Sequence, residues 1–396
     1  MNKISDEYIL SINCGTSSLK FALFRSDPSI IMEWSGQIDN IGSAKSYFMI
    51  RDHKGVTLAN DKLEHPDTVG AIKLLVKWLR KNSKQFKLRA IGHRIIQGGM
   101  LYKDHQMVSK KLIRSLKPLV SLAPNHLPDE LKTMTIFTKA FPEVPQVACF
   151  DTIFHKNMPF YSRYFSLPRT LRKDGVLRYG FHGLSCEYIT QKLKQISPRE
   201  AKGNVIIAHL GNGSSITAVQ NGKSIDTTMG LTPTGGLIMG ARSGDLDPGI
   251  ALYLMRKKKL SIDGLDRLVN YQSGLKGISG ISSDMRVLLE KEKTKIHAEE
   301  AIVMFCFQAT KFIAALSASL SGINTLVFTG GIGENASSIR SRICNNLKFL
   351  GIDIDEDKNK RHREIISAKK SVVSVRVIKT DEAYIIAQHT YHITTA

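Results

Sequence analysis

The stretch at residues 11–24 reads SINCGTSSLKFALF and places a short Gly/Thr/Ser turn between two apolar runs. Lys20 follows this turn at once, yet the P-loop pattern G-x-x-x-x-G-K-[ST] occurs nowhere in the sequence. Residues 19–24 have the character of a strand, whereas a P-loop is followed by a helix. The stretch therefore predicts a strand–turn–strand hairpin whose turn offers backbone N–H groups and hydroxyls to a phosphate.

The same pattern returns about half a chain later, where residues 204–223 read NVIIAHLGNGSSITAVQNGK. The Asn-Gly pair near the end of this second stretch predicts another hairpin turn. At 396 residues the chain is long enough for two domains, each with its own core. Two similar hairpins at this distance indicate duplicated domains that face each other across a cleft, with one end of a polyphosphate at each turn.

Helices are expected between and after these hairpins. Residues 297–320 have helical periodicity and end before Gly322, which can act as a C-terminal cap. Residues 325–329 are predicted to form a strand, followed by a glycine turn and a helix that begins near Asn335, a place suited to a phosphate or nucleotide. The sequence ends in a strand, an acidic turn and a helix, so the alternation predicts an α/β protein.

Cysteine usage and apolar runs bear on the compartment. The five cysteines show no C-x-x-C spacing, which favours a reducing cytoplasm without structural disulfides or zinc. Asp6 and Glu7 precede the first strand, so we do not expect a signal peptide. No run of about 18 uninterrupted apolar residues occurs, and the best candidate, residues 312–328, is broken by serines, Gly322 and Asn324. We therefore expect a cytoplasmic protein without a membrane span.

The net charge of +21 is unusual for a globular protein, with 56 Lys and Arg against 35 Asp and Glu. It fits either nucleic-acid binding or a basic surface on a protein that handles anions. The basic clusters at residues 256–259 and 358–363 lack interleaved aromatic residues, and no helix-turn-helix, KH or RNP signature accompanies them. We favour the second interpretation and expect no nucleic-acid partner.

Four dense stretches carry residues suited to catalysis: IGHRIIQGG (91–99), CFDTIFH (149–155), LRYGFHGLS (177–185) and MGLTPTGGLIMGARSGDLDPG (229–249). Each alone could be a surface loop. Together with three Gly/Ser turns they favour phosphoryl transfer, because Arg and His stabilise the charge that spreads over a phosphoryl group in flight. Mg²⁺ would need oxygen ligands, for which Asn13, Asp151 and Glu382 are candidates. No metal-binding His/Cys cluster or Ser–His–Asp order is legible, so hydrolysis ranks lower.

An ordered set of motifs resembles the acetate kinase (acetokinase) family, carboxylate kinases of the acetate and sugar kinase/Hsc70/actin superfamily. The motifs include NCGTSSLKF, GHRIIQGG, FDTIFH, RYGFHGLS, HLGNGSSI, SGISSDMR and FTGGIGENA, in family order. The resemblance implies two duplicated ribonuclease H-like (actin-like ATPase) α/β domains around a central nucleotide cleft. It implies a first domain at residues 1–150 plus 383–396, a second at 151–382, and a homodimer.

The resemblance also implies roles for individual residues. Asp151, His182 and Arg242 match the catalytic residues, and Asp151 could be a base, a positioning group or a metal-side ligand. Arg94 matches the arginine for the substrate carboxylate, and Asn13 matches a residue near Mg²⁺ or Mn²⁺. Glu382 matches the second metal-binding residue. The acyl pocket is expected at Ile96, Asn125, Phe181 and Pro233, and the ATP or ADP site at Lys20, His209, Leu210, Gly211, Asn212, Gly213, Asp284, Met285, Arg286, Gly331, Ile332, Gly333, Glu334 and Asn335.

The implied reaction is reversible ATP-dependent phosphorylation of acetate to acetyl phosphate by direct in-line transfer. A carboxylate is already ionised at pH 7 and needs no general base. The chain departs from the family pattern at Ile96, Gln97 and Asn125, around the acyl pocket, so the reaction type is better defined than the acyl preference. Phosphorylation of propionate or another short carboxylate is the close alternative. An actin- or Hsc70-like nucleotide-binding module is the alternative from another class.

Overall fold

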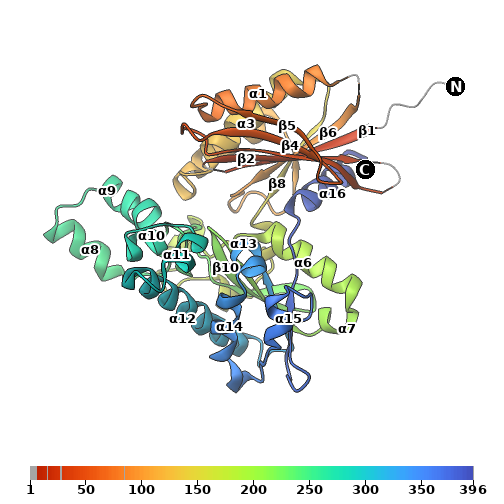
Figure 1. Cartoon of the computed structure of the whole chain (residues 1–396). Helices are drawn as coiled ribbons and strands as arrows, with labels where there is room; N and C mark the ends of the chain where they lie inside the picture. The colour runs from red at the N-terminus through yellow and green to blue at the C-terminus, as the bar shows by residue number, and fades with distance from the viewer. Residues whose placement is uncertain (1–6, 16, 27–28, 84, 396) are drawn as a thin grey trace. The chain divides into compact units, whose positions relative to one another are not determined.

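The structure, a computed structural model, describes residues 7–15, 17–26, 29–83 and 85–395. Thr16 of the first predicted turn and Asp6 lie outside the described residues. The chain forms two compact units, the first of Met1–Ile153 with Asp381–Ala396 and the second of Phe154–Thr380 (Figure 1).

The first unit contains an eight-stranded sheet in the order β5-β4-β3-β2-β1-β6-β8-β7. The predicted hairpin is confirmed, since β1 and β2 pair antiparallel with Asn13 opposite Lys20. β6 runs parallel to both β1 and β8, so the carboxyl ends of these three strands meet at one edge. Its strands are β1 (Glu7–Cys14), β2 (Ser18–Arg25), β3 (Ile31–Asp39), β4 (Tyr47–Asp52), β5 (Thr57–Lys62), β6 (Lys87–Ile95), β7 (Gln106–Met107) and β8 (Gln146–Phe150).

Helices cover both faces of this sheet, because side chains along a strand alternate between its faces. On β1, Leu10 and Ile12 pack into a core with α1 and α3, whereas Ile9 packs with Ala387 of α16 (Figure 1). Gly92 of β6 lets α16 approach closely, since a Cβ there would lie 2.2 Å from the Thr390 hydroxyl. The helices are α1 (Thr68–Lys81), α2 (Lys110–Leu116), η1 (Lys117–Leu122), α3 (Leu127–Ala140) and α16 (Glu382–Thr395).

The unit boundaries differ from the predicted ones, which fell at 150/151 and 382/383. They lie at 153/154 and 380/381, so Asp151 and Glu382 belong to the first unit. The Asp151 N–H donates to the Ile95 carbonyl at 2.8 Å, which keeps this residue on the edge of the first sheet. Glu382 is the first residue of α16, which packs on the same sheet.

The second unit contains a five-stranded sheet in the order β11-β10-β9-β12-β13. The second predicted hairpin is confirmed as β9 and β10, which pair antiparallel. The predicted Asn-Gly turn is also confirmed, since Asn221 and Gly222 have φ values of 50° and 74° as a two-residue hairpin turn requires. The strands are β9 (Asn204–Leu210), β10 (Ser214–Gln220), β11 (Lys223–Thr227), β12 (Thr325–Thr329) and β13 (Ser374–Val377).

The predicted long helix of the second unit is confirmed as α12 (Ile296–Ser319). This helix is long and apolar enough to cross a membrane by length and composition, with a mean hydropathy of 1.7 over 18 residues. This helix differs from residues 312–328, the candidate expected from the longest run of nearly uninterrupted apolar residues. Half of the apolar window of α12 is buried in the unit, where Ile302, Phe305 and Ile313 join its core, so α12 is a core helix.

The glycine-rich segment after β12 differs from its prediction. A turn followed by a helix near Asn335 was expected, but the glycines themselves form α13 (Gly330–Asn335), and α14 (Ser337–Asn345) follows. A side-chain contact explains this, since the Glu334 carboxylate accepts a hydrogen bond from the Gly330 N–H at 2.9 Å and closes the turn.

Most of the other helices of this part of the chain are short, and α6 is the longest of them at 14 residues. They are η2 (Ile153–His155), α4 (Phe160–Arg163), α5 (Thr170–Lys173), α6 (Gly183–Ile196), α7 (Pro198–Ala201), α8 (Pro248–Lys257), α9 (Ile262–Arg267), η3 (Leu268–Gln272), α10 (Gly274–Ser279), α11 (Met285–Lys291), η4 (Lys348–Leu350) and α15 (Glu356–Lys360).

Candidate functional site

In the first unit, carboxylates surround a single buried arginine at the carboxyl edge of the sheet. Arg94 lies near the end of β6 and is only 9% exposed. Its Nη2 donates to Asp151 Oδ2 at 2.8 Å, its Nη1 lies 3.7 Å from Glu130 Oε1, and its Nε lies 4.0 Å from Glu382 Oε2. The structure thus brings together three predicted site residues and adds Glu130, which the sequence analysis did not select.

These charges perturb one another strongly. Burial disfavours the charged guanidinium of Arg94, but the carboxylates of Asp151, Glu382 and Glu130 outweigh burial and raise its pKa. Burial raises the pKa of Glu130 to about 8, although Arg94 and the Ile96 N–H act in the opposite direction. Burial also raises the pKa of Glu382, and Asp151 adds to this effect. Even when Glu130 is protonated, the carboxylates of Asp151 and Glu382 outnumber the one arginine beside them.

Two predicted metal ligands meet at the same edge. The Asn13 amide donates to Glu382 Oε2 at 3.3 Å, and Lys20 lies opposite Asn13 on β2 with an exposed side chain. Carboxylate and amide oxygens are the ligands that Mg²⁺ prefers, and a divalent cation would offset the excess of carboxylates. The residues present therefore fit a hard cation such as Mg²⁺ or Mn²⁺.

The predicted acyl-pocket residues divide between the two units. Ile96 is buried directly after β6, and Asn125 is half-buried in the loop before α3. Phe181 and Pro233 are buried in the second unit. Gln97, next to Ile96, is fully buried: its Oε1 accepts from the Gly99 N–H at 2.8 Å, while its Nε2 has no hydrogen-bond partner among the described residues.

In the second unit, a histidine pair lies beside the β9–β10 turn. His182 caps the start of α6 in the left-handed conformation, with φ 56°, which a non-glycine residue rarely adopts. Its Nδ1 is 2.9 Å from Ser215 Oγ, and its ring stacks on His209 with centroids 4.2 Å apart. His209 Nδ1 is in turn 2.8 Å from Ser185 Oγ. Such strain is typical of residues held in place for function.

Arg242 reaches the same turn from the glycine-rich loop that follows β11. Its Nη1 donates to the Pro233 carbonyl at 2.6 Å. A Cβ at Gly213 would lie 2.7 Å from Arg242 Nη2 and 3.2 Å from His182 Nε2. The missing side chain therefore lets an arginine, a histidine and the backbone of the turn converge, an arrangement suited to an anionic group such as a phosphoryl.

The predicted nucleotide residues around α13 have mixed surroundings. Gly330 has φ 77° and packs against β9, since a Cβ there would lie 2.7 Å from the Leu210 carbonyl. Gly331 faces open space, as a ligand-binding glycine should. Glu334 Oε1 accepts from the N–H groups of Gly330 and Thr380, so its carboxylate shapes the loop. Asn335 likewise donates to the Gly331 carbonyl.

The remaining nucleotide candidates lie at the start of α11. Asp284 Oδ2 pairs with Arg286 Nη2 at 2.6 Å, and this contact lowers the pKa of the Asp284 carboxyl. The Arg286 side chain is 86% exposed and open to a ligand. Met285 and Leu210, by contrast, are buried in the core of the unit, so we expect them to support the site without contacting a nucleotide.

Several residues of these sites escaped the sequence analysis. Glu130 is one, and Arg340 is another: it is fully buried and donates to the carbonyls of Gly333 and Glu334, which fixes the end of α13. The Nε2 atom of His155 lies 3.0 Å from the carbonyl oxygen of Phe181. This contact supports Phe181, the residue before His182. The signal available in the sequence was a charged or polar residue at a position where the helix or strand period places an apolar one.

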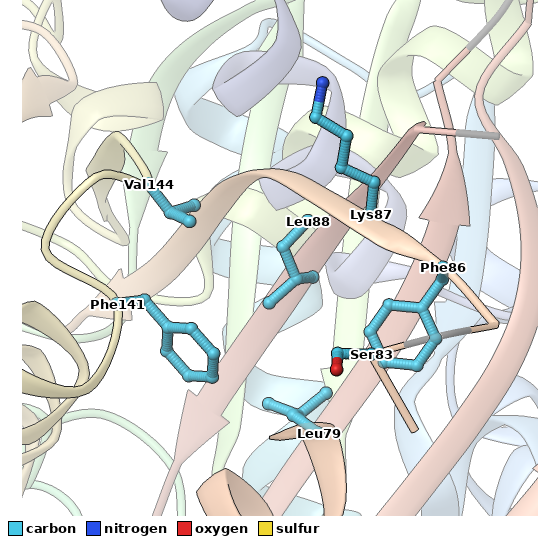
Figure 2. Close-up of a pocket in the computed structure, with 7 residues that line it drawn as sticks. All are labelled: Leu79, Ser83, Phe86, Lys87, Leu88, Phe141 and Val144. Carbon is cyan, nitrogen blue, oxygen red and sulfur yellow. The ribbon is translucent and has the colours of Figure 1, made fainter. Parts of the chain in front are cut away.

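A pocket of about 430 Å³ in the first unit lies away from these residues (Figure 2). Its lining includes Leu88 and Lys87 at the start of β6, whereas Arg94 lies near the other end of that strand, roughly 20 Å away at about 3.3 Å per residue. Figure 2 shows the Lys87 side chain extending away from Phe86 and the other apolar side chains, and its ammonium group pairs with Glu7 at 2.8 Å. The pocket is therefore separate from the candidate site.

Comparison with known proteins identifies the family of this chain. The profile of the Acetokinase family matches residues 8–388. An acetate kinase of Methylocella silvestris is 39% identical over 96% of both chains, and one of Rhodopseudomonas palustris is 40% identical over 98% of both. A crystal structure of a Francisella tularensis propionate kinase is 38% identical with a TM-score of 0.91, covering 98% of this chain and 99% of that one.

A Porphyromonas gingivalis acetate kinase structure is 34% identical with a TM-score of 0.86, at the same coverage. These structures confirm the predicted fold class, two α/β domains of the actin-like ATPase type. Both the family profile and the relatives span nearly the whole chain, and the relatives are kinases. The chain therefore belongs to the acetokinase family.

Proposed function

We propose that this chain catalyses the reversible ATP-dependent phosphorylation of acetate to acetyl phosphate. The observation that carries the proposal is the convergence of Arg242 and His182 on Gly213, within a chain that belongs to a kinase family. A nucleotide-binding module without chemistry would not need two cationic or hydrogen-bonding side chains directed at one glycine of a phosphate-type turn. Transfer of a phosphoryl group does need them, because charge develops on its equatorial oxygens.

Arg94 is proposed to bind the substrate carboxylate, since a guanidinium matches a carboxylate in charge and geometry. Asp151 is fully buried and accepts a hydrogen bond from Arg94, so we assign it to orienting this arginine. A general base is not required, because acetate is already ionised at neutral pH. Positioning and charge neutralisation then supply most of the rate enhancement, with the carboxylate oxygen attacking the γ-phosphorus in line.

Asn13 and Glu382 are proposed to hold Mg²⁺, with Mn²⁺ as a substitute. The cation would neutralise negative charge on the nucleotide phosphates. The chain's own contribution is to hold the Asn13 amide beside the Glu382 carboxylate, with Asn13 Nδ2 3.3 Å from Glu382 Oε2, at the edge of the first sheet. Lys20, exposed beside Asn13 on the neighbouring strand, is free to contact a phosphate.

Propionate is the second candidate substrate. It is favoured by the likeness to the Francisella tularensis propionate kinase and by the residues beside Arg94. Ile96, Gln97 and Asn125 depart from the family pattern around the acyl pocket, and Gln97 keeps a buried amide nitrogen without a partner among the described residues. One methylene in an apolar pocket changes selectivity by about 10–200-fold, so both acids must be tested.

A homodimer is the proposed assembly. Supporting it, large apolar side chains are exposed on three helices of the second unit, α8, α9 and α12. Apolar side chains that gather into one surface patch are typical of an interface. They include Leu252, Tyr253, Ile262, Val303 and Phe307.

We further infer a cytoplasmic location and no nucleic-acid partner. The five cysteines are buried and none forms a disulfide with another, as suits a reducing compartment. The net charge of +21 then describes a basic surface around an enzyme for anionic substrates. Binding to a polynucleotide with a steep salt dependence would contradict this inference.

The experiment is a hydroxylamine-trapping assay with ATP and Mg²⁺, in which acetate, propionate, butyrate and a hydroxy acid are compared in parallel. Acyl hydroxamate formed with acetate, and only with ATP and the cation, supports the proposal. Higher kcat/KM for propionate would support the second candidate. ATP hydrolysis that does not depend on any short carboxylate would reject both and favour a nucleotide-binding module.

A further inference from the structure

Glu130 is an acidic residue in the buried interior of the first unit, where the sequence alone gives no reason for one. It lies in the first turn of α3 and is fully buried. Its Oε2 accepts a hydrogen bond from the backbone N–H of Ile96 at 2.9 Å, and its Oε1 lies 3.7 Å from Arg94 Nη1. One carboxyl group therefore touches both the arginine proposed for the substrate carboxylate and the backbone of the predicted acyl pocket.

The surroundings of Glu130 favour its neutral form. The groups that interact with it are Arg94 of β6, Asp151 after β8, Asp129 of its own helix and Cys14 of β1. The Cys14 thiol is itself neutral, because burial raises its pKa to about 12. Burial and the two aspartates raise the pKa of Glu130 to about 8 against the pull of Arg94, so the protonated acid predominates at pH 7.

The charge on Glu130 matters because Arg94 has to bind an anion. Asp151 already accepts a hydrogen bond from Arg94 and offsets part of its charge, and Glu382 lies at the edge of ion-pair distance. A third ionised carboxylate at Glu130 would compete with the substrate for the guanidinium and would repel it. A neutral Glu130 keeps the hydrogen bond to Ile96 without this competition.

We propose that Glu130 is a positioning residue for the carboxylate substrate: its carboxyl group, held by the Ile96 N–H and lying beside the Arg94 guanidinium, fixes Arg94 relative to the Ile96 backbone. The proposal rests on the proposed role of Arg94. It predicts that ionisation of Glu130 weakens carboxylate binding while nucleotide binding stays unchanged.

The first test compares the pH dependence of KM for acetate and for ATP in the full-length enzyme, the Glu130→Gln variant and a control. Glutamine keeps the volume and an acceptor for the Ile96 N–H but cannot ionise. If only the protonated form binds acetate, its KM in the unsubstituted enzyme rises about tenfold at pH 9, while the KM for ATP stays level. Glu130→Gln should match the unsubstituted enzyme at pH 7 and lose the rise.

Two further variants separate positioning from bulk stability. Glu130→Ala leaves the Ile96 N–H without its acceptor and should raise the KM for acetate about tenfold at every pH, with kcat changed much less. Glu143→Gln makes the same chemical change at an exposed residue and should behave as the unsubstituted enzyme. A KM for acetate that stays level up to pH 9.5 in the unsubstituted enzyme would overturn the proposal.

The second test does not depend on activity. Infrared difference spectra between the unsubstituted protein and Glu130→Gln should show the C=O stretch of a protonated carboxylic acid at pH 7, lost as the pH rises past 8. Absence of this band means that Glu130 is ionised and contradicts the proposal. If the band is present but Arg94→Ala leaves the KM for acetate unchanged, the proposed role of Arg94 fails, and the assignment of Glu130 to substrate binding fails with it.

Discussion

The hairpins β1–β2 and β9–β10 share one backbone pattern but have opposite chemical surroundings. Beside the first, Asn13 touches a carboxylate, and the nearby arginine is surrounded by carboxylates. Beside the second, Gly213 lies against Arg242 and His182, and the ring of His182 stacks on the ring of His209. A repeated hairpin therefore supplies a scaffold, while the loops around each copy decide what it binds.

The two sites also differ in what holds them. The first is built from buried charges, which are costly to desolvate and depend on one another. The second is built from glycine backbone, a stacked histidine pair and hydroxyl contacts such as that of Ser215 to His182. We therefore expect substitutions in the first unit to change substrate binding, metal binding and stability, and substitutions in the second to change the rate of transfer.

The largest expected effect is on the second site. His182→Ala should lower kcat by about 10²–10³-fold, as loss of a group that stabilises a transition state does, with the KM for ATP within a few-fold. Steady-state kinetics in ATP and acetate measure both. His65→Ala is the matched control, because His65 is an exposed histidine that also has a positive φ, 40°. An equal change in kcat and nucleotide affinity would assign His182 to binding.

The next effect concerns the cation. Glu382→Gln should raise the concentration of Mg²⁺ needed for half-maximal rate by about 10–100-fold, because it removes a charged oxygen ligand. Stability should hold or rise, since a half-buried carboxylate is removed from a cluster that already has an excess. A Mg²⁺ titration checks this, with exposed Glu64→Gln as the control. An unchanged Mg²⁺ requirement would place the cation elsewhere.

A single methyl group should disturb the second site without touching a charge. Gly213→Ala places a Cβ 2.7 Å from Arg242 Nη2, so the guanidinium must move. We expect kcat to fall about tenfold or more, since displacements of this size cost up to about 10²-fold. Gly249→Ala, whose Cβ would meet only the Asp247 carboxylate at 3.3 Å, is the control. Unchanged kcat in Gly213→Ala would mean that this convergence is not used.

The smallest effect is on acid stability of the first unit. Burial lowers the pKa of His93 from 6.5 to about 4, against a hydrogen bond with Gln146. Between pH 6.5 and 4 the unfolded chain therefore binds more protons at His93 than the folded chain does. The contribution of neutral His93 to the free energy of unfolding is present at pH 7 and is lost as the pH falls toward 4. Its share of the loss between pH 7 and 5.5 is about 1 kcal/mol.

Urea unfolding at pH 7 and 5.5 measures this share. His93→Gln, which cannot titrate, should lose correspondingly less stability on acidification than the unsubstituted protein. Exposed His392→Gln should lose as much as the unsubstituted protein does. Identical pH dependence in all three proteins would show that His93 is charged in the folded state.

The sequence predicted both hairpins, the long helix α12 and the strand β12. It could do so because the repeat of apolar residues and the glycine or Asn-Gly turns depend on the local conformation of the backbone. It did not predict α13, where a Glu334 side-chain contact stabilises glycines in a helical turn. It also missed Glu130, because that residue's partner Arg94 is far away in sequence. Contacts of this kind follow only from the fold.

The most direct test of the division between the two sites compares Arg94→Gln with Arg242→Gln, varying ATP and acetate for each. Arg94→Gln should raise the KM for acetate by about 10–100-fold, the worth of a charged hydrogen bond, with a smaller loss in kcat. Arg242→Gln should lower kcat by about 10²-fold or more with the KM for acetate nearly unchanged. If both variants lose kcat and acetate affinity in the same proportion, the two sites do not have separate tasks, and the account is contradicted.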